Sequence, residues 1–129
     1  MRILSLRYFE GPNIYSYSPV VKVTVDIGRY EYLPTQKIAG FTDHLLELLP
    51  TLIEHQCSKG YPGGFVERLR EGTYLAHVFE HVAIELQNLA GYKICFGKAR
   101  STDRPGIYDA VYAAVCLRLD ERLRGILRF

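Results

Sequence analysis

Two histidines and a glutamate, His77, Glu80 and His81, form an H-x-x-E-H motif in the second half of the chain. On an α-helix, residues four positions apart point to the same side, so both imidazoles can bind one metal ion. The motif is the inverted form of the H-E-x-x-H zinc-protease signature, the order called inverzincin. In that arrangement the histidines bind Zn²⁺ and the glutamate acts as general base toward an activated water molecule. The spacing therefore indicates His77 and His81 as zinc ligands and Glu80 as the catalytic base.

A zinc hydrolase site also needs a third protein ligand and an open fourth position. Two residues are candidates: Cys57 would complete a His₂Cys set, and Glu85 would complete a His₂Glu set. Glu85 lies two helical turns beyond His77, roughly 12 Å along a straight helix, so it reaches a metal between the histidines only with difficulty. It is better placed to accept the imidazole N–H of His81 that zinc does not use. We favour Cys57 as the third ligand, keep Glu85 as a supporting residue or alternative ligand, and regard His55 as a weaker candidate.

The motif is predicted to lie on a helix over residues 73–90, which contain no Gly or Pro. Thr73 is the expected N-cap, and Gly91 is the expected glycine just past the end. At about 100° per residue, its leucines, valines and Phe79 form one apolar stripe, and the motif residues with Glu85 gather on the opposite side. The metal-binding side is therefore expected to face away from the core contact of this helix.

The remaining pattern predicts a mixture of strands and helices. Strands are expected over 2–9 and 21–27, paired as a wide hairpin, and over 92–98; residues 106–115 suit a strand or a helix, with a strand start favoured. Helices are expected over 41–56, kinked or split by Pro50, over 65–70 as a short turn, and over 117–129. This order describes an α+β fold: a two-layer sandwich of helices on a small antiparallel or mixed sheet, with the motif helix lying on the sheet.

The composition fits one domain over residues 1–129, with 48% hydrophobic residues and a formal charge of +2. That charge is too small to indicate a nucleic-acid partner. The N-terminus lacks the apolar region of a signal peptide and no stretch is long enough to span a membrane, so a cytoplasmic location is expected. Three cysteines, Cys57, Cys95 and Cys116, are an odd number at irregular spacing, which predicts reduced thiols.

A specific combination of residues surrounds the motif and extends toward both ends. It comprises Gly11-Pro12-Asn13, Glu54-His55-Gln56-Cys57-Ser58, Gly60, Gly63-Gly64-Phe65, Glu67-Arg68, Arg70-Glu71-Gly72-Thr73, His77, Glu80-His81-Val82, Glu85-Leu86-Gln87, Leu89-Ala90-Gly91, Phe96-Gly97, Arg100 and Pro105-Gly106-Ile107-Tyr108. With these residues the chain resembles the N-terminal domain of cyanophycin synthetases over almost its whole length.

Cyanophycin synthetases build a poly-aspartate polymer with arginine attached to each side chain, and they use ATP in two further ligase domains. The chain has no G-x-x-x-x-G-K-[ST] phosphate loop, so those ligations are not expected of it by itself. The resemblance implies a domain that holds the polymer near the ligase domains. Where H-x-x-E-H is present, it also implies a zinc metallopeptidase that cuts cyanophycin into short primers. A non-catalytic tethering domain is the main alternative, and a small-molecule lyase with the same His₂Cys ligands is a third.

The polymer presents both guanidinium and carboxylate groups, so a complementary cleft should contain both signs of charge. Glu67, Arg68, Arg70 and Glu71 lie just before the motif helix and are the charges expected to line it. Arg100, near Phe96-Gly97, is a further candidate for substrate binding.

Overall fold

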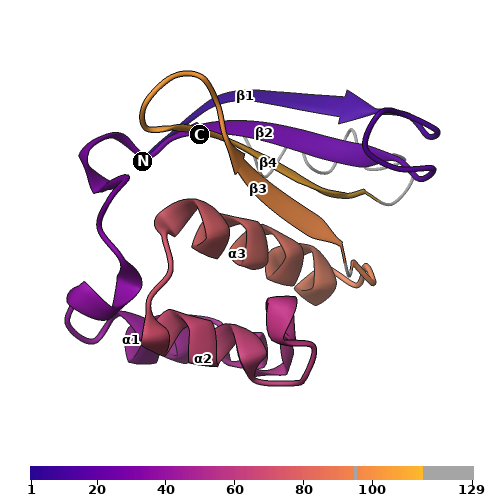
Figure 1. Ribbon diagram of the computed structural model, residues 1–129. Coiled ribbons are helices and arrows are strands. Elements are labelled where there is room, and N and C mark those ends of the chain that lie inside the picture. The colour runs from indigo at the N-terminus through magenta and orange to yellow at the C-terminus, as the bar shows by residue number, and fades with distance from the viewer. Residues whose placement is uncertain (95, 115–129) are drawn as a thin grey trace.

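The computed structural model describes residues 1–94 and 96–114 of the chain. Figure 1 shows a sheet at one side of the molecule, helix α3 (Leu75–Leu89) beneath it, and helices α1 (Phe41–Leu48) and α2 (Gly64–Glu71) on the far side of α3. The α+β class is confirmed, and the helical part has two tiers. The helix predicted over 117–129, together with Cys95 and Cys116, lies outside the described residues.

Within residues 1–94 and 96–114, the sheet contains four antiparallel strands in the order β1-β2-β4-β3. They are β1 (Arg2–Phe9), β2 (Val20–Asp26), β3 (Gly97–Ser101) and β4 (Ile107–Ala113). The predicted pairing of the first two strands is confirmed, with Leu6 opposite Val23. Residues 107–113 form a strand, as favoured from the sequence.

The strand predicted over 92–98 begins later than expected. Asn88, near the end of α3, donates a hydrogen bond from Nδ2 to the carbonyl of Ile94 and accepts one at Oδ1 from its N–H. Both backbone groups of Ile94 are therefore occupied by the helix end and unavailable to a sheet. Pairing with β4 starts at Gly97.

Helix α3 is covered on two sides, which corrects the prediction that its polar side faces away from the core. Leu75 and Phe79 pack on the sheet core, whereas Val78 and Val82 pack with the lower helices around Phe65. The sheet core consists of Val21, Val23, Val25 and Ile27, and the lower cluster also contains Leu52 and Leu69. Periodicity located the apolar residues, but it could not show that a second tier covers the other side.

The burial along α3 departs from the expected stripe in the same way. Glu80, His81 and Glu85 are only 8%, 6% and 4% exposed, whereas Leu86 and Leu89 are exposed at 54% and 58%. The charged and titratable side of this helix therefore lies inside the protein.

The segment predicted as one helix over 41–56 is split at Pro50. Helix α1 ends at Leu48, and Pro50 is the first residue of a separate 3₁₀ helix, where its fixed φ and missing N–H are tolerated. The short turn expected over 65–70 is the eight-residue helix α2. The 3₁₀ helices of the fold are Gly28–Tyr30, Thr35–Lys37, Pro50–Glu54 and Cys57–Lys59.

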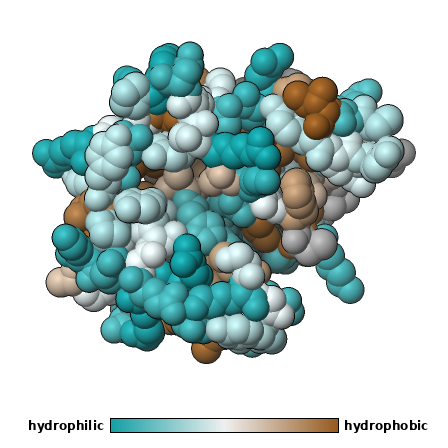
Figure 2. Space-filling model, viewed as in Figure 1, coloured by the Kyte–Doolittle hydropathy of each residue, from teal (hydrophilic) through white to brown (hydrophobic). Residues whose placement is uncertain are grey.

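Hydrophilic residues cover most of the face seen in Figure 2 and also line its hollow between the sheet and the lower helices. Among the described residues, no helix combines the length and apolar character needed to cross a bilayer.

Candidate metal centre

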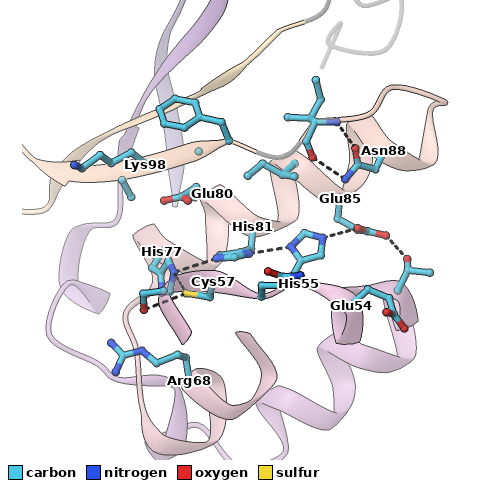
Figure 3. Close-up of a pocket in the computed structure, with 18 of the residues that line it drawn as sticks. Glu54, His55, Cys57, Arg68, His77, Glu80, His81, Glu85, Asn88 and Lys98 are labelled. Carbon is cyan, nitrogen blue, oxygen red and sulfur yellow. Dashed lines mark hydrogen bonds and ion pairs between the residues drawn. The ribbon is translucent and has the colours of Figure 1, made fainter. Parts of the chain in front are cut away.

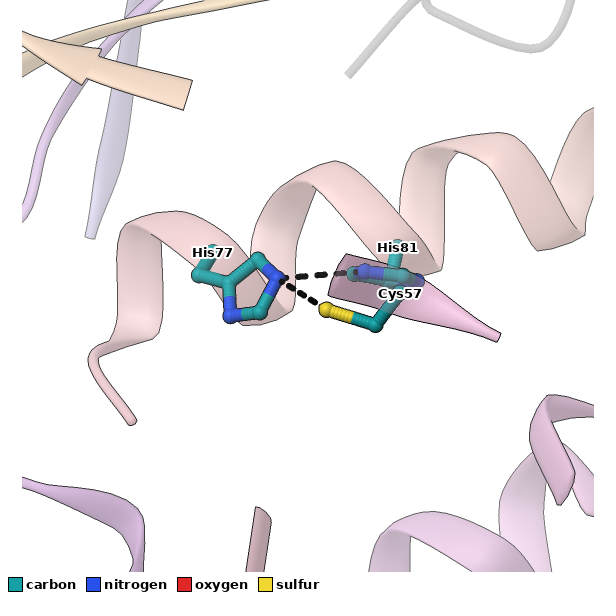
Figure 4. A group of neighbouring side chains, drawn as sticks. All are labelled: Cys57, His77 and His81. Atoms are coloured by element: carbon teal, nitrogen blue, oxygen red, sulfur yellow. Dashed lines mark hydrogen bonds between the residues drawn. The ribbon is translucent and has the colours of Figure 1, made fainter. Parts of the chain in front are cut away.

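Cys57, His77 and His81 lie together, with their ligand atoms all within 4.8 Å of one another. The His77 Nε2 is 3.2 Å from the Cys57 Sγ and 3.1 Å from the His81 Nε2 (Figure 4). Tetrahedral zinc with the usual bond lengths places neighbouring N and S ligands roughly 3.3–3.6 Å apart. A thiolate and two imidazoles are also ligands that zinc prefers, so this group of side chains fits a zinc ion.

The backbone of Cys57 adopts an uncommon conformation to reach this position. Its φ of +55° lies in the left-handed region, which residues other than glycine rarely occupy. The surrounding turn is fixed by a hydrogen bond from the Phe65 N–H to the His55 carbonyl and by the close approach of Gly64 to the Gln56 carbonyl. Such strained residues cluster at functional sites, where the rest of the structure holds them in place.

Phe65 and Thr73 orient the two histidines. The fully buried ring of Phe65 stacks on His81 with centroids 3.8 Å apart and planes 15° apart, and it meets His77 edge-on at 5.7 Å. The Thr73 hydroxyl lies 2.8 Å from the His77 Nδ1, leaving Nε2 directed at Cys57 and His81. Thr73 was predicted as the N-cap of the motif helix. The N-cap is instead Tyr74, and Thr73 contacts a metal-ligand candidate.

The surroundings keep both imidazoles neutral. Burial, followed by the positive charge of Arg68, lowers the pKa of His77. Burial, with smaller effects of His77 and His55, lowers the pKa of His81 to about 3. Metal binding requires the neutral ring, so both shifts favour it at neutral pH.

Glu80 lines the same cavity on the β3 side of the histidines (Figure 3). Burial raises the pKa of its carboxyl, although a backbone hydrogen bond from Ala99 and the charge of Lys98 act in the opposite direction. The approach of β3 at this point requires Gly97, since a Cβ there would lie 2.9 Å from the Glu80 Cγ. A carboxyl with a raised pKa is suited to accept and release a proton near neutral pH.

Glu85 was predicted to accept a hydrogen bond directly from His81, but the ring of His55 lies between them. Its Oε2 is 2.7 Å from the His55 Nε2, and the His55 Nδ1 is 2.9 Å from the His81 Nδ1. Its other oxygen accepts a short hydrogen bond from the Thr51 hydroxyl. His55, considered the weaker ligand candidate, thus stands between Glu85 and His81. In the sequence, its signal was its place in the Glu54-His55-Gln56-Cys57-Ser58 segment that carries the resemblance.

The metal-ligand candidates line a cavity of about 1050 Å³ between α3, β3 and the 3₁₀ helices. Arg68, a predicted substrate-binding residue, lines it, and its buried Nε has no hydrogen-bond partner within the described part of the chain. Lys98 and Glu54 also line it and were not predicted, because neither stands in the motif.

The other predicted substrate residues lie elsewhere. Glu67 and Glu71 both accept hydrogen bonds from Lys59, and Glu67 also accepts one from the Tyr61 hydroxyl. Arg70 forms an ion pair with Asp43 at 2.9 Å. Arg100 is paired with Asp109 in the register of β3 and β4 and is absent from the cavity lining. The charged residues of helix α2 are neighbours in sequence, but the helix places their side chains on different sides.

The sequence matches the family model described as "Cyanophycin synthase-like N-terminal domain" over residues 22–119. It is 42% identical to cyanophycin synthetase of Geminocystis herdmanii and 44% identical to those of Crocosphaera subtropica and Synechocystis sp., each over 117 residues. These alignments cover 89% of the chain and 13% of each relative. The chain therefore belongs to the family of cyanophycin synthase-like N-terminal domains.

Proposed function

We propose that this domain is a zinc-dependent hydrolase that cuts cyanophycin into short primers and binds the polymer for the ligase domains of a cyanophycin synthetase. One observation carries the proposal: the ligand atoms of Cys57, His77 and His81 converge within 4.8 Å beside the buried carboxyl of Glu80. Cyanophycin is proposed as the substrate because the chain belongs to this family.

Cys57, His77 and His81, which all line the cavity, would hold the zinc ion. When bound, zinc supplies Lewis acidity, which polarises a carbonyl and makes water a better nucleophile. The neutral state of both imidazoles and the matching ligand spacing support this assignment.

Glu80 would serve as general base and then as general acid. It takes a proton from the attacking water as the oxygen adds to the backbone carbonyl, and it returns the proton to the departing amide nitrogen as the C–N bond breaks. Its raised pKa supports both steps, because a strongly acidic carboxyl would accept a proton poorly.

The charges in the cavity support a polymer that carries both signs. Arg68 is the proposed partner of a polymer carboxylate, because its buried Nε, near His77, has no hydrogen-bond partner among the described residues. Lys98 adds positive charge above the histidines, and the Glu54 carboxylate, at the other end of the cavity, is placed for a guanidinium (Figure 3). One repeat unit would therefore enter with its carboxylate toward Arg68.

Incubation of the zinc-loaded domain with cyanophycin, followed over time by polymer length, tests the proposal. Wild-type protein should shorten the polymer, and Glu80→Gln should keep its zinc and lose on the order of 10²–10⁴ in rate, since the amide cannot accept the proton.

Two other results would contradict the hydrolase. If zinc-loaded wild-type protein binds the polymer but does not shorten it, the result would support a non-catalytic tethering domain instead. Zinc binding with neither polymer binding nor shortening would point to a small-molecule substrate.

A further inference from the structure

Two further side chains, those of His55 and Glu85, continue from His81, and each contact in the series is short. His81 Nδ1 lies 2.9 Å from His55 Nδ1, and His55 Nε2 lies 2.7 Å from the Glu85 carboxylate. The side chain of His55 is 11% exposed and that of Glu85 is 5% exposed. In Figure 3 the series runs along α3, away from Cys57 and His77. His55 and Glu85 are not members of the group formed by Cys57, His77 and His81 among the described residues.

For a neutral His55, the donors and acceptors in this series assign the position of each proton. A carboxylate can only accept hydrogen bonds, so the His55 Nε2 carries a hydrogen and donates it to Glu85. With His55 neutral, its Nδ1 has a lone pair and accepts from the His81 Nδ1–H. The neutral His81 then has its lone pair on Nε2, the atom 3.1 Å from the His77 Nε2. Thr51 anchors Glu85 through the other carboxylate oxygen.

We propose that His55 and Glu85 are positioning residues that select the Nδ1–H tautomer of His81 and so present its Nε2 to the metal before the metal binds. The assignment rests on the proposed function and names two residues that assemble its site. Glu85 acts through His55 because the His55 ring lies between the Glu85 carboxylate and the His81 Nδ1. In the opposite tautomer, Nε2 would carry a hydrogen and could not bind a cation.

The tautomer can be read directly from the ¹⁵N resonances of the histidine rings in metal-free wild-type protein at pH 8. We expect His81 to be protonated at Nδ1 and His55 at Nε2. A hydrogen on the His81 Nε2, with His55 protonated at both nitrogens, would overturn the proposal. This measurement does not involve cyanophycin, so its failure is distinct from a failure of the hydrolase.

Zinc titration of variants supplies a second, independent reading. Glu85→Gln should weaken zinc binding about 10- to 100-fold, as loss of a group that orients a ligand histidine does. Glu47→Gln, which removes an exposed carboxylate outside the cavity and outside this series, should change zinc affinity less than about twofold. Equal affinities of the two variants would overturn the role of Glu85.

Substitutions at His55 test the acceptor itself. Asn places an oxygen near the position of the His55 Nδ1, so His55→Asn should retain more zinc affinity than His55→Ala. If the Ala variant does not fold, the comparison of the Asn variant with wild type and the tautomer reading still decide the question. Indistinguishable zinc affinities of properly folded Asn and Ala variants would overturn the acceptor role.

Discussion

At the scale of single residues, Cys57 differs most from an ordinary core residue. It is the non-glycine residue with positive φ in the described part of the chain, and its sulfur completes the group with His77 and His81. A left-handed conformation costs an L-residue roughly 1–2 kcal/mol relative to the right-handed one. The fold therefore tolerates an unfavourable backbone conformation at the position whose thiol is a candidate metal ligand.

Replacing Cys57 with Gly and with Ala separates the two effects. Both variants should lose stoichiometric zinc binding because both lack the thiol. The metal-free Gly variant should be more stable than the Ala variant by about 1 kcal/mol, since glycine adopts positive φ without the Cβ clash. Chemical denaturation of both chelated proteins measures the difference. An Ala variant at least as stable as the Gly variant would show that position 57 carries no such strain.

At the scale of elements, the site depends on two close approaches made by glycines. Gly64, at the start of α2, lets the turn before Cys57 come against the helix, since a Cβ there would collide with the Gln56 carbonyl. Gly97, at the start of β3, lets that strand approach α3, since a Cβ would lie 2.6 Å from the Ile84 Cδ1 and 2.9 Å from the Glu80 Cγ. The first glycine positions a metal-ligand candidate, and the second positions the carboxyl of Glu80, the proposed general base.

Alanine at these two positions should therefore have different consequences. Gly64→Ala should weaken zinc binding because the turn with Cys57 must shift. Gly97→Ala should largely retain zinc but slow cyanophycin cleavage, because Glu80 or the strand must move. Each overpacked contact should also lower the free energy of unfolding by about 1–3 kcal/mol. Zinc titration and cleavage rates on both variants measure this, and a Gly97→Ala protein that loses zinc while Gly64→Ala keeps it would reverse the assignment.

At the scale of the whole molecule, the sequence predicted the α+β class and the helix of the motif, because alternation in β2 and the absence of Gly and Pro over 73–90 are local signals. It did not predict that a second tier of helices buries the other side of α3. That arrangement depends on contacts of α3 with Phe65 and Leu52, which are distant in sequence from much of α3.

The same limit applies to the candidate site. The i, i+4 spacing predicted His77 and His81 as ligands. Cys57 was favoured as the third ligand because Glu85 lies far along the helix, and Glu85 was kept as an alternative. The insertion of His55 between His81 and Glu85 follows from the turn after Pro50, whose course local sequence patterns do not specify. Likewise, only the three-dimensional packing separates Arg68, inside the cavity, from Glu67 and Arg70 outside it.

X-ray absorption at the zinc edge of the loaded wild-type domain tests the central claim, a metal centre with one thiolate and two imidazoles, most directly. We predict one sulfur at about 2.3 Å and two imidazole nitrogens at about 2.0–2.1 Å, with the remaining ligand a light atom. Cys57→Ser, the matched control, should lose the sulfur signal. A wild-type spectrum with no sulfur, or with no imidazole contribution, would contradict the assignment of Cys57, His77 and His81.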